Sequence, residues 1–512
     1  MSPSVRSEKF HFPSREYSLD AIPSLSVRGN GDVPVSHIDP KVLRRATLKI
    51  DFYLIPIIGM FYLLSFLDRT NIGNARIAGL ETSLNMSPKQ FSIALTITYV
   101  PYILMELPMN LLMKRLGANV TLPLMVILWG IVCACQGAVH SYYGLLVCRF
   151  FLGAFEGGLF PGITLLLSIF YKRHAMQLRF ALMFSVTSLA GAFSGLLAFG
   201  IRDLNGQYGI SGWRWVFILE GGFTVAFGLA TFFFVPASPK TIKILTEEER
   251  QTYCRDLAYD WSGDADTLGT YLEVFSWSEV ASVFTDAPHV LMLFLPFFFN
   301  GATIYGLANF TPTIVNALGH SANYTQLLTV PPFACSFVFS IVSAYFSDKY
   351  KNRGVTATIC ALIAAAGFAL FLFSNDKDVN YGALFLQITG AYAMAPCLST
   401  WNANNVQPHY RRATAVAIGY IGTNSGGIAS TWLFTDPPHF RKATRINLVF
   451  SLAMATCAVG TIIYFRARNA QRQRVVQRLV QIHGDDTGVG GWDSLAERKR
   501  LGDRHPRFEF TT

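Results

Sequence analysis

The residues of this chain best suited to do chemistry are a few charged side chains inside long apolar stretches. Glu106, Arg149 and Glu156 lie deep within such stretches, and Glu220 lies nearer the end of another. Ionisable groups are costly in a hydrocarbon environment, so each is a functional hypothesis by default. Arginine stays cationic and can fork onto a carboxylate, while a glutamate can carry a proton. The pattern indicates recognition of a small organic anion together with a proton.

The depth of these groups follows from helix geometry. At 1.5 Å per helical residue, Arg149 lies about 9 Å, Glu156 about 20 Å and Glu106 about 24 Å below the outer ends of their spans. We therefore expect Arg149 to bind substrate, and Glu156 or Glu106 to couple transport to protons. An alternative for Arg149 is a salt bridge that holds one conformation, and Pro108 favours a structural role for Glu106.

The second half of the chain offers neutral polar groups, because its apolar stretches contain no Asp, Glu, Lys or Arg. Asn309, Asn424 and Tyr305 are expected to contact substrate, since amides and aromatic rings at a cavity wall can bind and stack a flat acid. The alternative is that these asparagines form hydrogen bonds between helices.

Two further charged pairs lie at the ends of apolar stretches. Asp68 and Arg69 close the first stretch, where they would form an outer gate or a helix-end network. Asp348 and Arg353 lie in a short basic loop of the second half and are expected to lock its inner face.

These residues need transmembrane helices to position them. Of 512 residues, 51% are hydrophobic and only 14% are charged, against about 25% charged in soluble domains. A spanning helix needs about 20 mostly apolar residues. The twelve predicted spans are 50–67, 90–113, 119–140, 143–170, 178–201, 214–235, 288–317, 325–347, 355–374, 380–402, 411–434 and 446–466. The sequence therefore predicts an all-α membrane protein.

Charge sets the expected orientation, because basic residues favour the cytoplasmic side. Basic residues gather before the first span and after the last, which places both tails in the cytoplasm. The predicted parts are a tail (1–49), a six-helix bundle (50–235), a cytoplasmic loop (236–287), a second six-helix bundle (288–466) and a tail (467–512). Thr246 and Glu249 in the loop form a capping box that predicts a short helix. The net charge of +10 comes with neither zinc-finger spacing nor a basic zipper, so we expect no nucleic-acid partner.

Helix breakers recur at similar offsets in the two halves. Pro161 and Pro396 are one such pair, and the Gly191/Gly195 motif matches Gly422/Gly426. Small residues four apart let helices approach closely. The repeat predicts two pseudo-symmetric bundles around a midplane site, the layout of a rocking transporter.

Four sequence strings carry a family resemblance: FLDRTNIGNA at 66–75, ELPMN at 106–110, RFFLG at 149–153 and GWRWVF at 212–217. Together they resemble the fungal anion:cation symporter group of the major facilitator superfamily, which includes allantoate- and nicotinate-permease-like proteins. Two features depart from common superfamily patterns. The loop at 113–119 lacks an acidic residue, whereas 347–353 keeps one, and the fifth span lacks the Gly-Pro pair of many proton-driven exporters.

The resemblance implies proton-coupled uptake of a nicotinate-like or allantoate-like carboxylate by alternating access. We expect a monomer that crosses a bilayer, the plasma membrane, several times. Neither a cofactor, a metal nor an enzymatic activity is expected, because the sequence contains no nucleophile–base pair, phosphate loop or metal-ligand spacing. The alternatives are an exporter of a secondary metabolite and a non-transporting nutrient sensor on the same fold.

Overall fold

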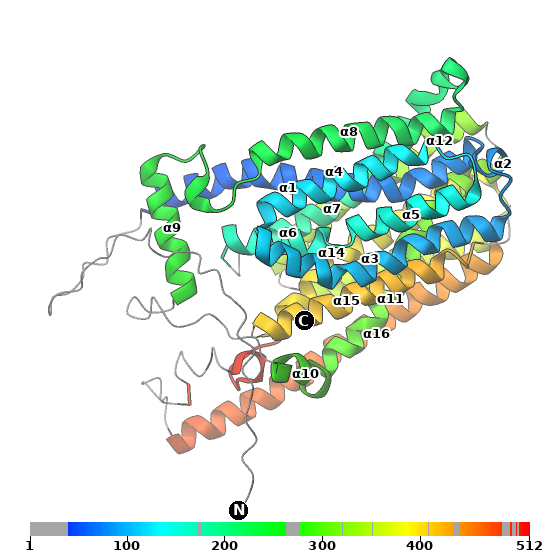
Figure 1. The fold of residues 1–512 in the computed structure, drawn as a ribbon. Coiled ribbons are helices and arrows are strands. Elements are labelled where there is room, and N and C mark those ends of the chain that lie inside the picture. The colour runs from blue at the N-terminus through cyan, green and yellow to red at the C-terminus, as the bar shows by residue number, and fades with distance from the viewer. Residues whose placement is uncertain are drawn as a thin grey trace, which may run out of the picture.

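The computed structural model describes a protein built of long, nearly parallel helices (Figure 1). It describes residues 39–172, 176–262, 277–319, 321–350, 352–407, 409–434, 440–483, 492–493, 498 and 501–512. Most of the predicted first tail (1–38), part of the loop (263–276) and much of the region after 483 lie outside these residues. Within the described residues all regular secondary structure is helical.

The long helices form two bundles. The N-terminal bundle contains α1 (Pro40–Ile77), α3 (Pro88–Leu116), α4 (Ala118–Gln136), α5 (Tyr142–Glu156), α6 (Leu159–Phe170), α7 (Met176–Ile201) and α8 (Gly212–Phe234). The C-terminal bundle contains α11 (Pro288–Ala317), α12 (Ala322–Tyr350), α13 (Arg353–Phe373), α14 (Lys377–Asn404), α15 (His409–Ser430) and α16 (Arg441–His483). Short helices connect them: α2 (Leu80–Ser83), α9 (Glu247–Ser262) and α10 (Trp277–Asp286). We call the end where α1 finishes the outer end, following the orientation predicted from charge.

Ten helical segments of the described chain are long and apolar enough to cross a membrane, with α5 and α6 counted as one. The remaining two long helices, α3 and α15, pack within the same bundles. This arrangement confirms the predicted all-α membrane fold of two bundles.

The first helix differs from its prediction. The apolar stretch ends at residue 67, but α1 continues to Ile77. Residues 68–75 are nevertheless buried, because neighbouring helices supply partners for their polar side chains. Hydropathy alone marked the helix end about 15 Å too early.

The predicted fourth span is broken into α5 and α6 by Gly157 and Gly158 rather than by Pro161. Pro161 lies in the first turn of α6, where a missing N–H removes no intrahelical hydrogen bond. A side chain at Gly158 would collide with Met109 and Met125, so the break lets this helix approach α3 and α4 closely.

Helix α9 confirms the capping-box prediction. The Thr246 backbone N–H donates to Glu249 Oε2 (3.0 Å), and the Glu249 N–H donates to Thr246 Oγ1 (3.3 Å). The helix binds the inner end of the N-terminal bundle, where Lys49 pairs with Glu249 and Lys172 pairs with Asp256, each at 2.7 Å.

The two bundles meet along α1–α11, α3–α15 and α7–α12. Their outer halves are in close contact. Gly73 lies against the backbone of Asn309, and Gly195 lies against the Gln326 carbonyl, where any side chain would collide. The structure is therefore closed on the outer side. Gly426, the repeat partner of Gly195, instead packs within its own bundle against α11.

Candidate functional site

A small cavity lies between the bundles, about halfway along the helices. It has a volume of about 10 Å³, which is roughly the space that one water molecule needs. Its lining comes from α1, α3, α5 and α11: Arg69, Leu95, Thr98, Tyr99, Tyr102, Arg149 and Asn309. Two arginines that line one cavity between the bundles mark it as the candidate binding site.

Arg69 lies at the centre of a buried network. Its Nη2 is 3.1 Å from Glu156 Oε1, and its Nη1 donates to the Tyr305 hydroxyl at 2.9 Å. Ser65 also donates to Glu156 Oε1. The guanidinium carbon lies 4.6 Å from the centre of the Tyr102 ring. Cation, carboxylate and aromatic rings thus form one wall of the cavity.

The position of Arg69 differs from that expected. Arg69 and Asp68 lie about 12 Å before the end of α1, inside the bundle rather than at its outer end. Arg69 lines the same cavity as the predicted site residues Arg149 and Asn309.

Arg149 is buried, with only 1% of its surface exposed, and it also lines the cavity. Its Nε and Nη2 atoms have no hydrogen-bond partner among the described residues, and none of those residues forms an ion pair with it. The guanidinium lies 5.8 Å from the Phe217 ring centre. Two unpaired N–H groups on one edge of a guanidinium have the geometry that binds a carboxylate.

The predicted neutral groups of the second half are brought together. Asn309 lines the cavity, and its Oδ1 is without a partner among the described residues. Tyr305 accepts from Arg69 and donates to Asn424 Oδ1 at 3.4 Å. Glu106 is half-buried on α3 and forms neither a hydrogen bond nor an ion pair with the described residues of this network.

A second polar network is buried in the N-terminal bundle. Asp68, Cys133 and Glu220 bring three side-chain atoms within 4.8 Å of one another. The Cys133 thiol donates to Asp68 Oδ1 at 2.9 Å, and Asn71 donates to Glu220. One oxygen of each carboxyl has no partner among the described residues. These three atoms could in principle hold a metal ion, but the Arg149 charge nearby disfavours a cation.

Glu220 belongs to this network and does not pair with Arg214, the basic residue six positions earlier on α8. Arg214 instead donates to the Gly137 carbonyl (2.9 Å) and contacts His140. Glu220 is 3% exposed and faces Asn71.

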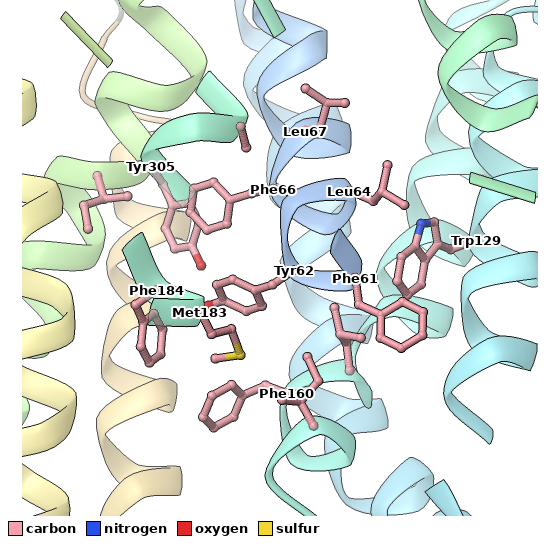
Figure 2. Packing of buried hydrophobic residues seen from close by; sticks show 14 of the residues in the cluster. Phe61, Tyr62, Leu64, Phe66, Leu67, Trp129, Phe160, Met183, Phe184 and Tyr305 are labelled. Carbon is pink, nitrogen blue, oxygen red and sulfur yellow. The ribbon is translucent and has the colours of Figure 1, made fainter. Parts of the chain in front are cut away.

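Aromatic residues close the cavity on the inner side. Tyr62 lies about 10 Å inward of Arg69 along α1, and its ring centre is 5.5 Å from that of Phe184. Phe160 and Phe184 both contact Tyr420 of the opposite bundle, at 3.8 and 6.1 Å between ring centres. Figure 2 shows Tyr62, Met183 and Phe184 grouped below Phe66 and Tyr305. We call Tyr62, Phe160, Phe184 and Tyr420 the aromatic layer.

Asp348 and Arg353 form an ion pair of 2.9 Å at the inner end of the C-terminal bundle. The side chain of Arg353 is 9% exposed and that of Asp348 is 41% exposed. The pair joins the end of α12 to the start of α13, which matches the place expected for it.

Sequence reasoning missed Tyr99, Tyr102 and Ser65 as neighbours of the site. Both tyrosines lie in a stretch of α3 that contains many apolar residues, where an aromatic residue packing in the core looks the same as one lining a cavity. Their position toward the cavity follows from the contact of α3 with α5, where Gly153 and Gly157 leave no room for side chains.

Comparison with known proteins gives a consistent result. The sequence profile described as Major Facilitator Superfamily matches residues 58–431. An uncharacterized transporter of Schizosaccharomyces pombe is 32% identical over 452 residues, covering 87% of this chain and 89% of that protein. The high-affinity nicotinic acid transporter of Saccharomyces cerevisiae is 28% identical over 479 residues, covering 93% and 86%.

The fold is also similar to a solved structure. The crystal structure of a D-xylose-proton symporter superposes with a TM-score of 0.61 at 15% sequence identity, covering 80% of this chain and 97% of that one. At this identity the likeness concerns the fold alone.

Proposed function

Because this chain belongs to the major facilitator superfamily, whose members here are multi-pass membrane transporters and not enzymes, we propose that it imports a small carboxylate together with a proton across the plasma membrane. The observation that carries the proposal is Arg149, a buried guanidinium with two unpaired N–H groups that lines the cavity between the bundles. Among the relatives, the nicotinic acid transporter supports an organic acid as cargo.

In this proposal Arg149 binds the carboxylate on one edge of its guanidinium, and Asn309 contacts the rest of the molecule. The rings of Tyr99 and Tyr102 line the same cavity and offer stacking surfaces for a flat substrate. The cavity must widen to admit cargo, since its present volume is about 10 Å³. Rocking of the bundles about the site supplies that change.

The proton is carried in this proposal by Glu156 rather than by Glu106. Glu156 is the carboxylate that holds Arg69. When Glu156 takes up a proton, Arg69 loses its buried partner and is free to pair with the incoming anion. The buried charge then changes little, which avoids the large cost of an uncompensated buried ion. Asp68 and Glu220, with one unpaired oxygen each, form a second carboxyl pair able to share a proton.

The test uses purified protein in liposomes with labelled nicotinate and, separately, a labelled ureide carboxylate. We expect uptake of one of them to rise when the outside is acid, and a protonophore to abolish the rise. Uptake indifferent to both pH gradient and protonophore would refute proton coupling. Failure of a carboxylate panel, together with export from loaded vesicles, would favour an exporter instead.

A further inference from the structure

Residues 501–512 occupy a groove at the inner end of the C-terminal bundle. The groove is formed by residues of α13, α14, α15 and α16. Helix α10 lies beside the segment (Figure 1). We propose that this groove is a peptide-binding site whose ligand is the chain's own segment 501–512, and that its occupancy keeps the C-terminal bundle competent for transport. We call this segment the strap.

Two asparagines bind the backbone of the strap at two points each. Asn469 donates to the Phe510 carbonyl (2.8 Å) and accepts from the Phe510 N–H (2.9 Å). Asn405 donates to the Thr511 carbonyl (3.1 Å) and accepts from the Thr511 N–H (2.8 Å). Paired amide bonds to consecutive residues satisfy an extended backbone in the way that a sheet edge does.

Two other side chains extend this recognition. The Trp401 indole N–H donates to the Thr511 carbonyl at 2.9 Å, and Arg472 donates to the Phe508 carbonyl at 2.8 Å. The strap is therefore held by contacts to its backbone at three residues, Phe508, Phe510 and Thr511.

Phe510 anchors the strap in an aromatic pocket. Its ring stacks on Phe465 at 4.9 Å between centres and lies 5.3 Å from His289. The guanidinium carbon of Arg472 lies 4.3 Å from the centre of the Phe510 ring. Phe510 is 6% exposed, so the strap covers apolar surface of helices α11 and α16 that would otherwise face water.

An ion pair fixes the other end of the strap. Arg411 is fully buried at the start of α15, and its Nη2 lies 3.2 Å from Asp503 Oδ2. Arg411 also contacts Ser282 at 3.1 Å and Asp286 at 3.9 Å, both on α10. Asp503 therefore ties the strap to both α15 and, through the shared guanidinium, α10.

The contacts of the strap described above all involve residues of the C-terminal half, so it moves with that bundle during rocking. It holds the inner end of α15, the helix that carries Asn424 and Tyr420, together with those of α14 and α16. The segment thus acts within the bundle as a ligand that fixes its shape, and its release is a route by which transport can be regulated.

The test uses a chain ending at residue 500 and a synthetic peptide of residues 501–512 carrying a fluorophore. A tethered segment has an effective concentration of about 1 mM, so we expect the peptide to bind the shortened chain with Kd below about 1 mM. We expect the shortened chain to melt at a lower temperature and to take up less substrate than the full chain. The peptide, supplied on the inner side, should restore both. A peptide with Phe510→Ala should do neither. Absence of binding at 1 mM, or equal binding of the Phe510→Ala peptide, would overturn the proposal.

If the shortened chain does not fold, the full-length protein provides the test. Trypsin cleavage after Arg504 requires the strap to leave the groove. Asn469→Leu should accelerate that cleavage at least tenfold, whereas Asn205→Leu, a matched amide loss in the outer loop, should not. Equal cleavage rates in the two variants would overturn the proposal.

Discussion

Arg69 on α1 and Glu156 at the end of α5 form a buried ion pair across the wall of the cavity, with 3.1 Å between Nη2 and Oε1. Their exposed side-chain fractions are 8% and 1%. The pair links α1, whose outer half carries many polar side chains, to α5, which ends at the break at Gly157. It places a releasable cation beside the unpaired guanidinium of Arg149.

The first prediction concerns this ion pair. Loss of one partner of a buried pair costs about 3–5 kcal/mol. Arg69→Gln and Glu156→Gln should therefore each lower the melting temperature clearly, while the double variant should lose much less than the sum. A double-mutant cycle from thermal melting measures this coupling. Additive losses would show that the two side chains do not interact.

The second prediction concerns Arg149. A hydrogen bond to a charged group contributes about 1.5–3 kcal/mol, so Arg149→Ala should reduce uptake efficiency about 10- to 100-fold. Arg149→Lys keeps the positive charge but cannot bind a carboxylate through two N–H groups. Its uptake should lie between that of the unchanged protein and that of Arg149→Ala. The measurement is initial uptake rate normalised to protein in the membrane. Arg214→Ala is the matched control and should stay within about twofold, since its contacts lie at the outer end. Unimpaired uptake by Arg149→Ala would remove this residue from the site.

The third prediction concerns the outer contact between the bundles. At Gly195 a Cβ would meet the Gln326 carbonyl at 2.7 Å, whereas at Gly200 on the same helix it would meet nothing within 4 Å. Gly195→Leu should hold the outer ends of the bundles apart, and Gly200→Leu should not. Spin labels at Thr82 and Asn375, both exposed at the outer end, should report a longer distance only in the first variant. The same distance in both variants would contradict close contact of the two bundles at Gly195.

The fourth prediction concerns the pH dependence of strap binding. Burial raises the pKa of Asp503 to about 6, despite the opposing charges of Arg411 on α15, Arg472 on α16 and Arg504. Asp286 of α10 faces the same arginines. The docked strap thus binds a proton more tightly than the free strap, so docking weakens as pH rises through 6. The peptide of residues 501–512 should bind about tenfold more tightly at pH 5 than at pH 7.5.

An Asp503→Asn peptide is the control for this titration. It should bind with nearly the same affinity at both pH values, since the side chain no longer ionises. Equal pH dependence of the two peptides would assign the effect to a group other than Asp503.

Much of the fold could be predicted because it depends on local physical rules. Long apolar stretches must be helical in a bilayer, and the capping box at Thr246 and Glu249 formed as expected. The break at Gly157 was missed because Pro161 is the stronger helix breaker in isolation. Its position in a first turn made it harmless, and the packing of α3 against α5 selected the glycines instead.

The site was only partly predictable for a similar reason. Arg149 stood out because a charge in an apolar stretch is unusual. Arg69 did not, because it lies among Asp68, Thr70 and Asn71, a polar series that resembles a helix end. Partners from distant helices, Glu156 and Glu220, keep that series buried and helical. Which helices meet is set by tertiary packing, so the sequence spacing could not reveal it.

The aromatic layer makes the two sides of the molecule unequal. On the outer side, several turns of helix must separate before anything can enter. On the inner side, single aromatic rings meet across the interface, with 3.8 Å between the ring centres of Tyr420 and Phe160. Side-chain rotations take nanoseconds or less, whereas domain rocking takes microseconds to milliseconds. Once the cavity has widened around cargo, these rings should therefore turn aside many times faster than the two bundles can rock, which makes the rocking of the bundles the slow stage of each cycle.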